Sequence, residues 1–415
     1  METPAYVAGI DIGTTKICTV IGSYTGGKPL EVLGVGLVPS RGLKSGIVVD
    51  RQDAVTCVLQ SVEKAQQMAN LPIQAAYIGI SGDHTRSVNV VGRVHTGTDA
   101  EVTAEDVEQV KQSAVDSVAL PVGREIIHTI VRDFSIDGTA GVARPIGMSG
   151  RRLEVLLHVV TGMSTVIANV RRCCEAAGIE VQAHVLEPIA TARAVLTDAE
   201  RDLGVLIIDI GGGTTDVGVF ADNSICHTAT VPVAGNRISR DIAQVLRVSV
   251  EDAEALKCRF GTSLPELVRE DDLVHVAKAD GFGSDQVPRR LIAEIMQARL
   301  SEIFEAVKSE LARAPIPKPG GIVLSGGGCQ APGTAKLASG VFDDLPVRTS
   351  EPRNLSGLAH IVATPVYATG VGLAMIAADE DARATGKPAP TATPADTIYS
   401  WAVALWQKLL QHKPW

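Results

Sequence analysis

The chain carries VAGIDIGTTKICTVIG at residues 7–22, and a related stretch, VLIIDIGGGTTDVGVF, follows at residues 205–220. Each copy has an apolar run that ends in Asp, a turn rich in Gly and Thr, and a second apolar run, which is the pattern of a hairpin between two buried strands. Asp11 and Asp209 hold equivalent places in the two copies. Because the hairpins stand about half a chain apart, they predict two similar domains.

Strand and helix patterns alternate along the rest of the chain, which predicts an α/β fold. Residues 51–70 have the spacing of a helix, residues 75–82 and 153–162 that of buried strands, and Thr103 with Asp106 that of a capping box. The predicted units are a first domain at 1–82 and 161–198, a subdomain inserted in it at 83–160, a second domain at 199–232 and 315–378, a largely helical insertion in it at 233–314, a flexible Pro-, Ala- and Thr-rich linker at 379–397, and a terminal helix at 398–415.

Composition and charge exclude several classes of protein. The 415 residues are 45% hydrophobic and 20% charged, as in globular domains, and the formal net charge of -9 with scattered basic residues predicts no nucleic-acid partner. Seven cysteines without a CxxC spacing, including the adjacent Cys173 and Cys174, predict reduced thiols that lie mostly in the core. The N-terminus has no secretory pattern and no run of eighteen apolar residues occurs, so neither export nor a membrane-spanning helix is expected.

The two hairpins have the chemistry of a phosphate clasp. Their glycines let backbone N–H groups approach a ligand, and their threonines add hydroxyl donors. Asp11 and Asp209 would hold a hydrated Mg²⁺, which takes few protein ligands, and Lys16 would neutralise phosphate charge. One copy alone is equally a tight turn between core strands, but two copies favour a nucleotide. The predicted phosphate-binding residues are Gly13, Thr14, Thr15, Lys16, Gly211, Gly212, Gly213, Thr214 and Thr215.

A third glycine-rich segment, IVLSGGGCQ at 322–330, also runs from an apolar strand into glycines. By itself it is compatible with a helix-entry turn. Beside the two hairpins it predicts a loop against an adenosine, so that the expected ligand is ATP with Mg²⁺. The residues expected to complete this side of the site are Gly235, Asn236, Glu254, Lys257, Gly326, Gly327 and Gly328.

Motifs over about residues 6–378 resemble those of the FtsA family of bacterial cell-division proteins, within the superfamily of actin, the sugar kinases and the large heat-shock chaperones. They read GIDIGTTKI, KSGIVVD, REIIHTIVRDFSIDG, RPIGMSG, VLEPIATARAVL, DIGGGTTDVGVF, VAGNRISRDIA, AEALK, GIVLSGGG and PVYATGVGLAM. The resemblance implies an actin-like two-domain ATPase fold in which residues 83–160 form the family's distinctive subdomain. Arg151, where the family often has an apolar residue, and the loop at 280–288 depart from the family pattern.

The resemblance also implies a function. The expected protein is a scaffold at the division site that binds ATP, forms actin-like filaments, ties the tubulin-like FtsZ ring to the cytoplasmic face of the membrane, and recruits later division proteins. The FtsZ C-terminal peptide is expected on the insertion at 233–314, at Arg299 with Arg289 and Arg290, although solvated helix charges are the alternative interpretation. Another bacterial actin-like scaffold, similar to MreB or PilM, and a sugar kinase remain alternatives; a chaperone would need a large domain after residue 378.

Glu187, in the segment LEPIATA, has two interpretations. The resemblance places it where actin-like proteins position the water that attacks the terminal phosphate. A carboxylate before Pro188 is also favoured by the dipole at a helix N-terminus. ATP binding is therefore expected, while hydrolysis is left open.

The end of the chain, IYSWAVALWQKLLQHKPW at 398–415, predicts an amphipathic helix that lies on a membrane surface. No acidic residue follows Asp396, so this end suits anionic lipid, although docking on the protein's own body or on a partner is the alternative. The residues expected at the membrane are Ile398, Trp401, Leu405, Trp406, Lys408, Leu409, Leu410 and Lys413.

Overall fold

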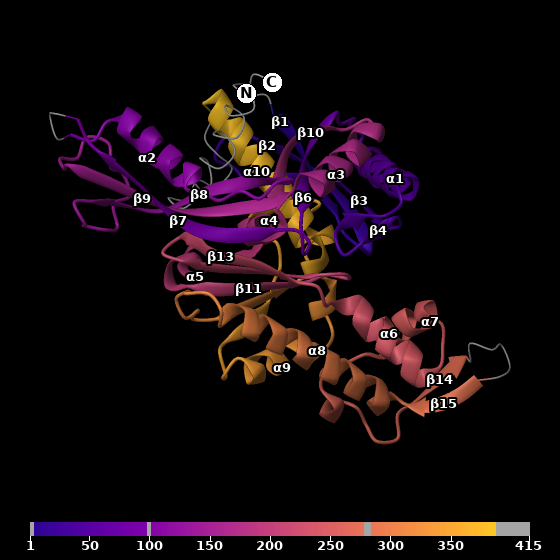
Figure 1. Cartoon of the computed structure of the whole chain (residues 1–415). Coiled ribbons are helices and arrows are strands. Elements are labelled where there is room, and N and C mark those ends of the chain that lie inside the picture. Colours follow the sequence, from indigo (N-terminus) through magenta and orange to yellow (C-terminus); the bar gives the residue numbers. More distant parts are fainter. Residues whose placement is uncertain (1–3, 98–100, 278–283, 387–415) are drawn as a thin grey trace.

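The computed structural model describes residues 4–97, 101–277 and 284–386. It has an α/β architecture built on two main sheets, one of six strands and one of five, with smaller sheets attached (Figure 1). Within these described ranges, none of the helices combines the length and the apolar composition that a bilayer crossing requires.

The six-stranded sheet contains the first hairpin and has the order β10-β6-β1-β2-β3-β18. Strands β1, β2 and β3 form an antiparallel meander, β6 and β10 run parallel to β1, and β18 runs parallel to β3 at the far edge. The strands are β1 (Ala5–Ile12), β2 (Lys16–Tyr24), β3 (Leu30–Pro39), β6 (Ala75–Ile80), β10 (Glu180–Leu186) and β18 (Leu355–Gly357).

The five-stranded sheet contains the second hairpin and has the order β13-β12-β11-β16-β17. It repeats the arrangement of the first sheet, because β11, β12 and β13 form an antiparallel meander and β16 and β17 run parallel to β11. The strands are β11 (Val205–Ile210), β12 (Thr215–Ala221), β13 (Ser224–Val231), β16 (Ile322–Ser325) and β17 (Val347–Thr349). The sequence repeat thus corresponds to two sheets that share a five-strand arrangement, to which the first sheet adds β18 at its edge.

Helices cover the six-stranded sheet on both faces. On one face α1 packs against β2 and β3, with α3 beside it; on the other α10 packs against β1, β2 and β6 and lies along α4. Helix α4 also contacts β11 and β12, so it lies between the two main sheets. These helices are α1 (Arg51–Ala69), α3 (Ser164–Ala176), α4 (Glu187–Val195) and α10 (Ala368–Thr385).

The remaining helices of the second half pack on the five-stranded sheet or next to it. Helix α5 contacts β12, α8 contacts β13, α6 and α7, and α9 packs between α8 and β17. Their bounds are α5 (Asp198–Leu203), α6 (Gly235–Leu246), α7 (Val250–Phe260), α8 (Arg289–Leu311) and α9 (Thr334–Val341).

The segment between β6 and α3 forms a separate three-stranded sheet of order β7-β9-β8, covered by α2, and projects from the body (Figure 1). It has its own apolar core around Val110, Leu153 and Leu157. The predicted capping box is confirmed, because Thr103 N–H donates to Asp106 Oδ2 at 2.8 Å and Asp106 N–H donates to Thr103 Oγ1 at 3.2 Å. The elements are β7 (Arg86–His95), α2 (Ala104–Asp116), β8 (Arg124–Ile136) and β9 (Arg152–Met163).

Two short hairpins complete the fold. One, β4 (Leu43–Lys44) with β5 (Ile47–Val48), precedes α1; the other, β14 (Leu273–Ala277) with β15 (Ser284–Pro288), precedes α8. The prediction of a largely helical insertion missed β14 and β15. The signal was the alternation of Val274 and Val276, which are both buried in the second main core.

The cysteines agree with the prediction of reduced, mostly buried thiols. All seven are free; six are buried, and Cys258 on α7 is exposed.

The predicted start of the linker is wrong. Helix α10 continues through Thr385, so residues 379–385 belong to the folded body. Its last turns are held by a buried ion pair of 2.7 Å between Arg193 Nε and Asp379 Oδ2 and by a hydrogen bond of 2.6 Å from the Tyr24 hydroxyl to Asp381 Oδ2. The segment was assigned to the linker by its Pro-, Ala- and Thr-rich composition, but its aspartates are partners of Arg193 and Tyr24 in the folded body.

Glu380, in the same helix, leads to a prediction about stability and pH. Burial and the nearby charge of Asp379 raise its pKa from 4.5 to about 7, although Arg383 opposes the shift. The folded protein therefore holds this proton up to about pH 7, whereas the unfolded chain loses it near pH 4.5. Because the folded state binds the proton more tightly, the free energy of unfolding falls as the pH rises between these two values.

We expect Glu380→Gln to leave the melting temperature almost unchanged at pH 5 and to raise it by a few degrees at pH 8. Calorimetric melts at both pH values measure this. Glu294→Gln, which alters an exposed glutamate beside Arg290, is the control and should show no pH-dependent gain. An equal change at both pH values for Glu380→Gln would contradict the prediction.

Candidate functional site

The turns of the two hairpins meet each other between the main sheets. In each turn the first residue closes the loop, since Gly13 N–H donates to the Lys16 carbonyl and Gly211 N–H to the Thr214 carbonyl, both at 3.0 Å. A Cβ atom added to Gly212 would lie 2.1 Å from Thr15 Cγ2. Glycine is therefore required there, because any side chain would push the two turns apart.

A cavity of about 260 Å³ lies at this meeting point. It is lined by almost all of the residues that the sequence assigned to the two clasps and the adenosine side, so residues more than 300 positions apart in the chain form one site. The predicted residues in its wall are Asp11, Gly13, Thr14, Thr15, Lys16, Glu187, Asp209, Gly211, Gly212, Gly213, Thr214, Gly235, Asn236, Glu254, Lys257, Gly326, Gly327 and Gly328.

Thr215 is the exception. It is fully buried and lies outside the cavity wall, and its hydroxyl donates to the Val233 carbonyl at 2.7 Å. The strand pairing explains the difference: Ile12 pairs with Ile17 and Ile210 with Thr215, so each turn holds four residues and Thr215 is already the first residue of β12. Thr215 therefore supports the backbone that leads to α6 and does not face the cavity.

Lys16 is held among the acidic groups of the cavity. Its Nζ lies 3.2 Å from Asp11 Oδ2 and also donates to the Val366 carbonyl, just before α10. Burial alone would lower the pKa of Lys16, but the charges of Asp11 and Asp209 outweigh it and raise the pKa. The ammonium group is therefore firmly cationic at the place where phosphate charge is expected.

The cavity wall contains more acidic side chains than lysines. Burial raises the pKa of Asp209, and burial followed by the charges of Asp11, Asp216 and Asp209 raises the pKa of Glu187 well above its ordinary value. For Asp216, burial is the main cause of a pKa of about 7. This concentration of carboxylates disfavours further negative charge, and a cation in the cavity would relieve it.

Glu187 is the first residue of α4 and faces the cavity, with Pro188 beside it in the first turn. Its position fits both interpretations of the sequence, because a residue at a helix N-terminus can also face the ligand. The geometry adds that its carboxylate shares the cavity with Asp11, Asp209 and Asp216.

The side predicted for adenosine is built from α6 and α7. Gly235 N–H donates to the Gly211 carbonyl at 3.0 Å, so the start of α6 is fastened to the second turn. Lys257 Nζ lies 2.6 Å from Glu254 Oε2 and donates to the Gly235 carbonyl at 3.3 Å, while Ser239 donates to the same glutamate. These contacts place Glu254 and Lys257 in the cavity wall, while their part in binding adenosine stays a prediction.

Sequence reasoning missed several residues of the wall, among them Ser81, Asp216 and Thr369. Asp216 had a local signal, because it follows the threonines of the second hairpin and pairs with Asp209 across the strands. Ser81, after β6, and Thr369, in α10, had none, since tertiary packing alone brings them to the cavity.

The arginines predicted to bind a partner peptide lie on α8 and make contacts within the chain. Arg299 Nε and Nη2 bind Asp241 Oδ2 and Oδ1 on α6 at 2.6 and 3.0 Å, which is a bidentate pair. Arg289 Nη1 lies 3.4 Å from Asp272 Oδ2, and Arg290 pairs with a glutamate one turn along the helix at 3.2 Å. Arg299 thus joins α8 to α6, and is not the solvated helix charge of the alternative interpretation. A peptide would have to compete with Asp241 or add to it, and the role of these arginines in binding a partner stays a prediction.

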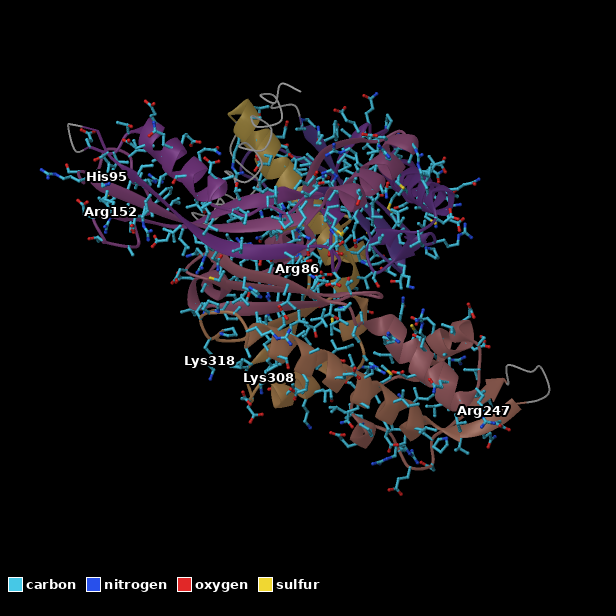
Figure 2. The ribbon with its side chains drawn as sticks, viewed as in Figure 1. Arg86, His95, Arg152, Arg247, Lys308 and Lys318 are labelled. Atoms are coloured by element: carbon cyan, nitrogen blue, oxygen red, sulfur yellow. The ribbon has the colours of Figure 1, made fainter. Side chains whose placement is uncertain are left out.

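The basic residues labelled in Figure 2 lie on separate parts of the molecule. His95 and Arg152 lie at the far end of the inserted three-stranded sheet, Lys308 and Lys318 below the five-stranded sheet, and Arg247 at the end of α6. That the chain has no nucleic-acid partner stays a prediction.

The predicted membrane helix at 398–415, with Trp401 and Trp406, and the linker from 387 onward lie outside the described residues. Their structure and their role stay predictions.

Two family models match the chain. The model of the cell division protein FtsA matches residues 206–372, and the model of the SHS2 domain inserted in FtsA matches residues 82–161. Among curated proteins, the cell division protein FtsA of Pseudomonas aeruginosa is 40% identical over 377 residues, which cover 90% of both chains. FtsA of Escherichia coli K12 is 34% identical over 376 residues, covering 88% of this chain and 89% of that protein.

Solved structures show the same fold at low sequence identity. The PilM–PilN type IV pilus biogenesis complex matches with a TM-score of 0.62 and 16% identity, covering 89% of this chain and 97% of that chain. MreB5 of Spiroplasma citri bound to ADP matches with a TM-score of 0.52 and 14% identity, covering 88% and 94%. These likenesses confirm the predicted actin-like α/β fold. The identity to curated proteins along nine-tenths of the chain shows more than the fold: this chain belongs to the FtsA family of cell-division proteins.

Proposed function

We propose that this chain binds ATP with Mg²⁺ in the cavity between the two hairpins and acts as an actin-like scaffold of bacterial cell division. The observation that carries the nucleotide site is the meeting of two topologically equivalent turns around one cavity, with Asp11, Asp209 and Lys16 in its wall. Structures of MreB5 with the same fold contain ADP or AMPPNP, which supports a nucleotide as the ligand. ATP binding is the proposed role of the cavity.

The donor set of the cavity fits this ligand. Backbone N–H groups of the glycine turns and Lys16 suit phosphates, and Asp11 and Asp209 suit a cation bound to those phosphates. In the parts of the chain that the structure describes, no group of three or more His, Cys, Asp and Glu side chains could hold a metal ion. A cation here would therefore draw most of its ligands from phosphate and water, as Mg²⁺ commonly does. Isothermal titration of the purified chain with ATP, with and without Mg²⁺, tests the proposal, and no heat of binding would refute it.

In the cell, the proposed scaffold forms filaments, binds the FtsZ ring, attaches to the cytoplasmic face of the membrane at the division site, and recruits later division proteins. Membership of the FtsA family supports these roles, as do the inserted SHS2-type subdomain at 83–160 and the predicted tail. An MreB- or PilM-like role and a sugar kinase are the less favoured alternatives. Sedimentation velocity with ATP checks self-association, since a strictly monomeric protein at high concentration would contradict the filament.

The FtsZ contact is proposed on the helical insertion at 233–314, at Arg299. We expect Arg299→Glu to weaken binding of an FtsZ C-terminal peptide about tenfold, because the reversal repels an acidic peptide. Fluorescence polarisation with a labelled peptide measures the dissociation constant. Arg299 also holds Asp241, so Asp241→Asn, which breaks that pair without reversing a charge, is the matched control. Equal losses in the two variants, or no loss in Arg299→Glu, would place the peptide elsewhere.

A further inference from the structure

The Asp209 carboxylate is held by hydroxyl groups that come from the other side of the domain boundary. Thr191 Oγ1 donates to Asp209 Oδ2 at 3.0 Å, and Thr369 Oγ1 lies 3.0 Å from Thr191 Oγ1 and 3.4 Å from the same Oδ2. Thr191 belongs to α4 and Thr369 to the first turn of α10, which covers the six-stranded sheet, whereas Asp209 is the penultimate residue of β11 in the five-stranded sheet. The three groups thus join the two halves of the protein at the cavity.

These groups are shielded from water. Thr191 is 0% exposed, Thr369 5% and Asp209 7%. A hydrogen-bonded chain from Thr369 to Thr191 to Asp209 uses each hydroxyl proton once and leaves neither hydroxyl unsatisfied. Because a buried hydrogen bond to a charged group is stronger than one in water, the chain fixes the orientation of the carboxylate.

The packing of α4 against α10 keeps the two hydroxyls in register. A Cβ atom added to Gly372 would lie 1.7 Å from the Ala190 carbonyl oxygen, so only glycine permits the observed approach of these helices. Ala190 and Gly372 are each within one turn of the corresponding threonine. The hydroxyl pair is therefore part of a rigid contact between two helices and not a pair of freely rotating side chains.

We propose that Thr191 and Thr369 are positioning residues for the cation of the nucleotide site: they hold Asp209 Oδ2 so that the carboxylate is pre-oriented toward the cation. The inference rests on the proposed function, because it concerns the Mg²⁺ that accompanies ATP. It assigns a role to Thr191, in the motif VLEPIATARAVL, and to Thr369, in PVYATGVGLAM, which both lie outside the glycine-rich turns that predicted the site. It also makes the cation site depend on how helices α4 and α10 pack against the five-stranded sheet, because Asp209 lies in β11 whereas the hydroxyls that orient it lie on these two helices.

The test is Thr191→Val, which keeps the shape of the side chain and removes the hydroxyl. We expect the affinity for a fluorescent ATP analogue in Mg²⁺ to fall about tenfold, and the Mg²⁺ concentration for half-maximal binding to rise by a similar factor. Affinity measured in EDTA should stay within about twofold, since the phosphate turns are untouched. Thr369→Val should show the same pattern with about a threefold effect, and Thr191→Ser should restore binding.

Thr19→Val is the matched control. It removes a hydroxyl from another buried pair, in which Thr19 Oγ1 lies 2.8 Å from Ser61 Oγ, on the α1 side of the six-stranded sheet. It should lower thermal stability about as much as Thr191→Val and leave the Mg²⁺ dependence unchanged.

The outcomes separate the two ideas. If Thr191→Val weakens binding equally in Mg²⁺ and in EDTA, or leaves the Mg²⁺ dependence unchanged while the unaltered chain binds ATP, the positioning role is refuted and the nucleotide site stands. If the unaltered chain does not bind ATP at all, the proposed function fails and the inference with it.

Discussion

Replacement of Asp209 by Ala is expected to lower the affinity for Mg-ATP by roughly 100-fold. The carboxylate lies at the end of β11 in the cavity wall, and its charge helps to keep Lys16 protonated. Its loss removes a cation ligand and leaves the Thr191 hydroxyl without its acceptor. Both effects act on the Mg²⁺-bound ligand, so the loss should be larger in Mg²⁺ than in EDTA.

Isothermal titration with ATP, in Mg²⁺ and in EDTA, measures this difference. Cys329→Ser is the control, because Cys329 is buried next to the third glycine loop and donates to the Gly326 carbonyl, a bond that serine can keep. It should bind ATP nearly as well as the unaltered chain. If Asp209→Ala retains full Mg²⁺-dependent affinity, Asp209 is not a cation ligand and the cation has been assigned to the wrong carboxylate.

The main frame of the fold could be predicted because its signals are local. Each hairpin lies in one continuous stretch of sequence, with an apolar run on either side of a glycine turn. The repeat of this pattern therefore predicted the two hairpins and the site between them. The capping box of Thr103 and Asp106 was predictable for the same reason. Local patterns of this kind predict structure because burial and backbone geometry constrain residues that are neighbours in the sequence.

Matching letters within the repeat led to one error. The sequence pairs Thr14 and Thr15 with Thr214 and Thr215, but the strand register aligns Thr14 and Thr15 with Gly212 and Gly213. The number of residues needed to close the turn decides the alignment, and not the identity of the side chains. Asp216, which the same register places opposite Asp209, was missed for this reason.

The contacts that join distant segments could not be predicted from local patterns. Lys16 binds the carbonyl of Val366, and Thr369 approaches Asp209, across separations of 350 and 160 residues. The linker boundary failed similarly, since only tertiary structure shows that Asp379 meets Arg193 in the interior. The composition of a segment carries no information about the distant residues that it contacts in the folded protein.

Deletion of residues 398–415 is expected to release the protein from anionic liposomes while ATP binding remains intact. Plotted as a helix at about 100° per residue, the segment places Trp401, Leu405, Trp406 and Leu409 in one apolar arc with Gln407 opposite. Indole rings suit the headgroup boundary, and each lysine near an anionic surface adds on the order of 1 kcal/mol. Because one short helix binds reversibly, stable attachment would need many tails on one filament, which ties membrane binding to self-association.

Two single substitutions distinguish the contribution of the apolar arc to membrane binding from that of the overall charge. Trp406→Glu puts a carboxylate within the apolar arc and should abolish co-sedimentation with liposomes that contain anionic lipid. Gln407→Glu adds the same charge on the polar side, so it lowers the electrostatic attraction equally but keeps the apolar face, and it should still bind. If the tail instead docks on the protein's own body or on a partner, neither change will affect sedimentation. Equal losses in both variants would mean that charge alone holds the protein at the membrane and that the tail does not insert as an amphipathic helix.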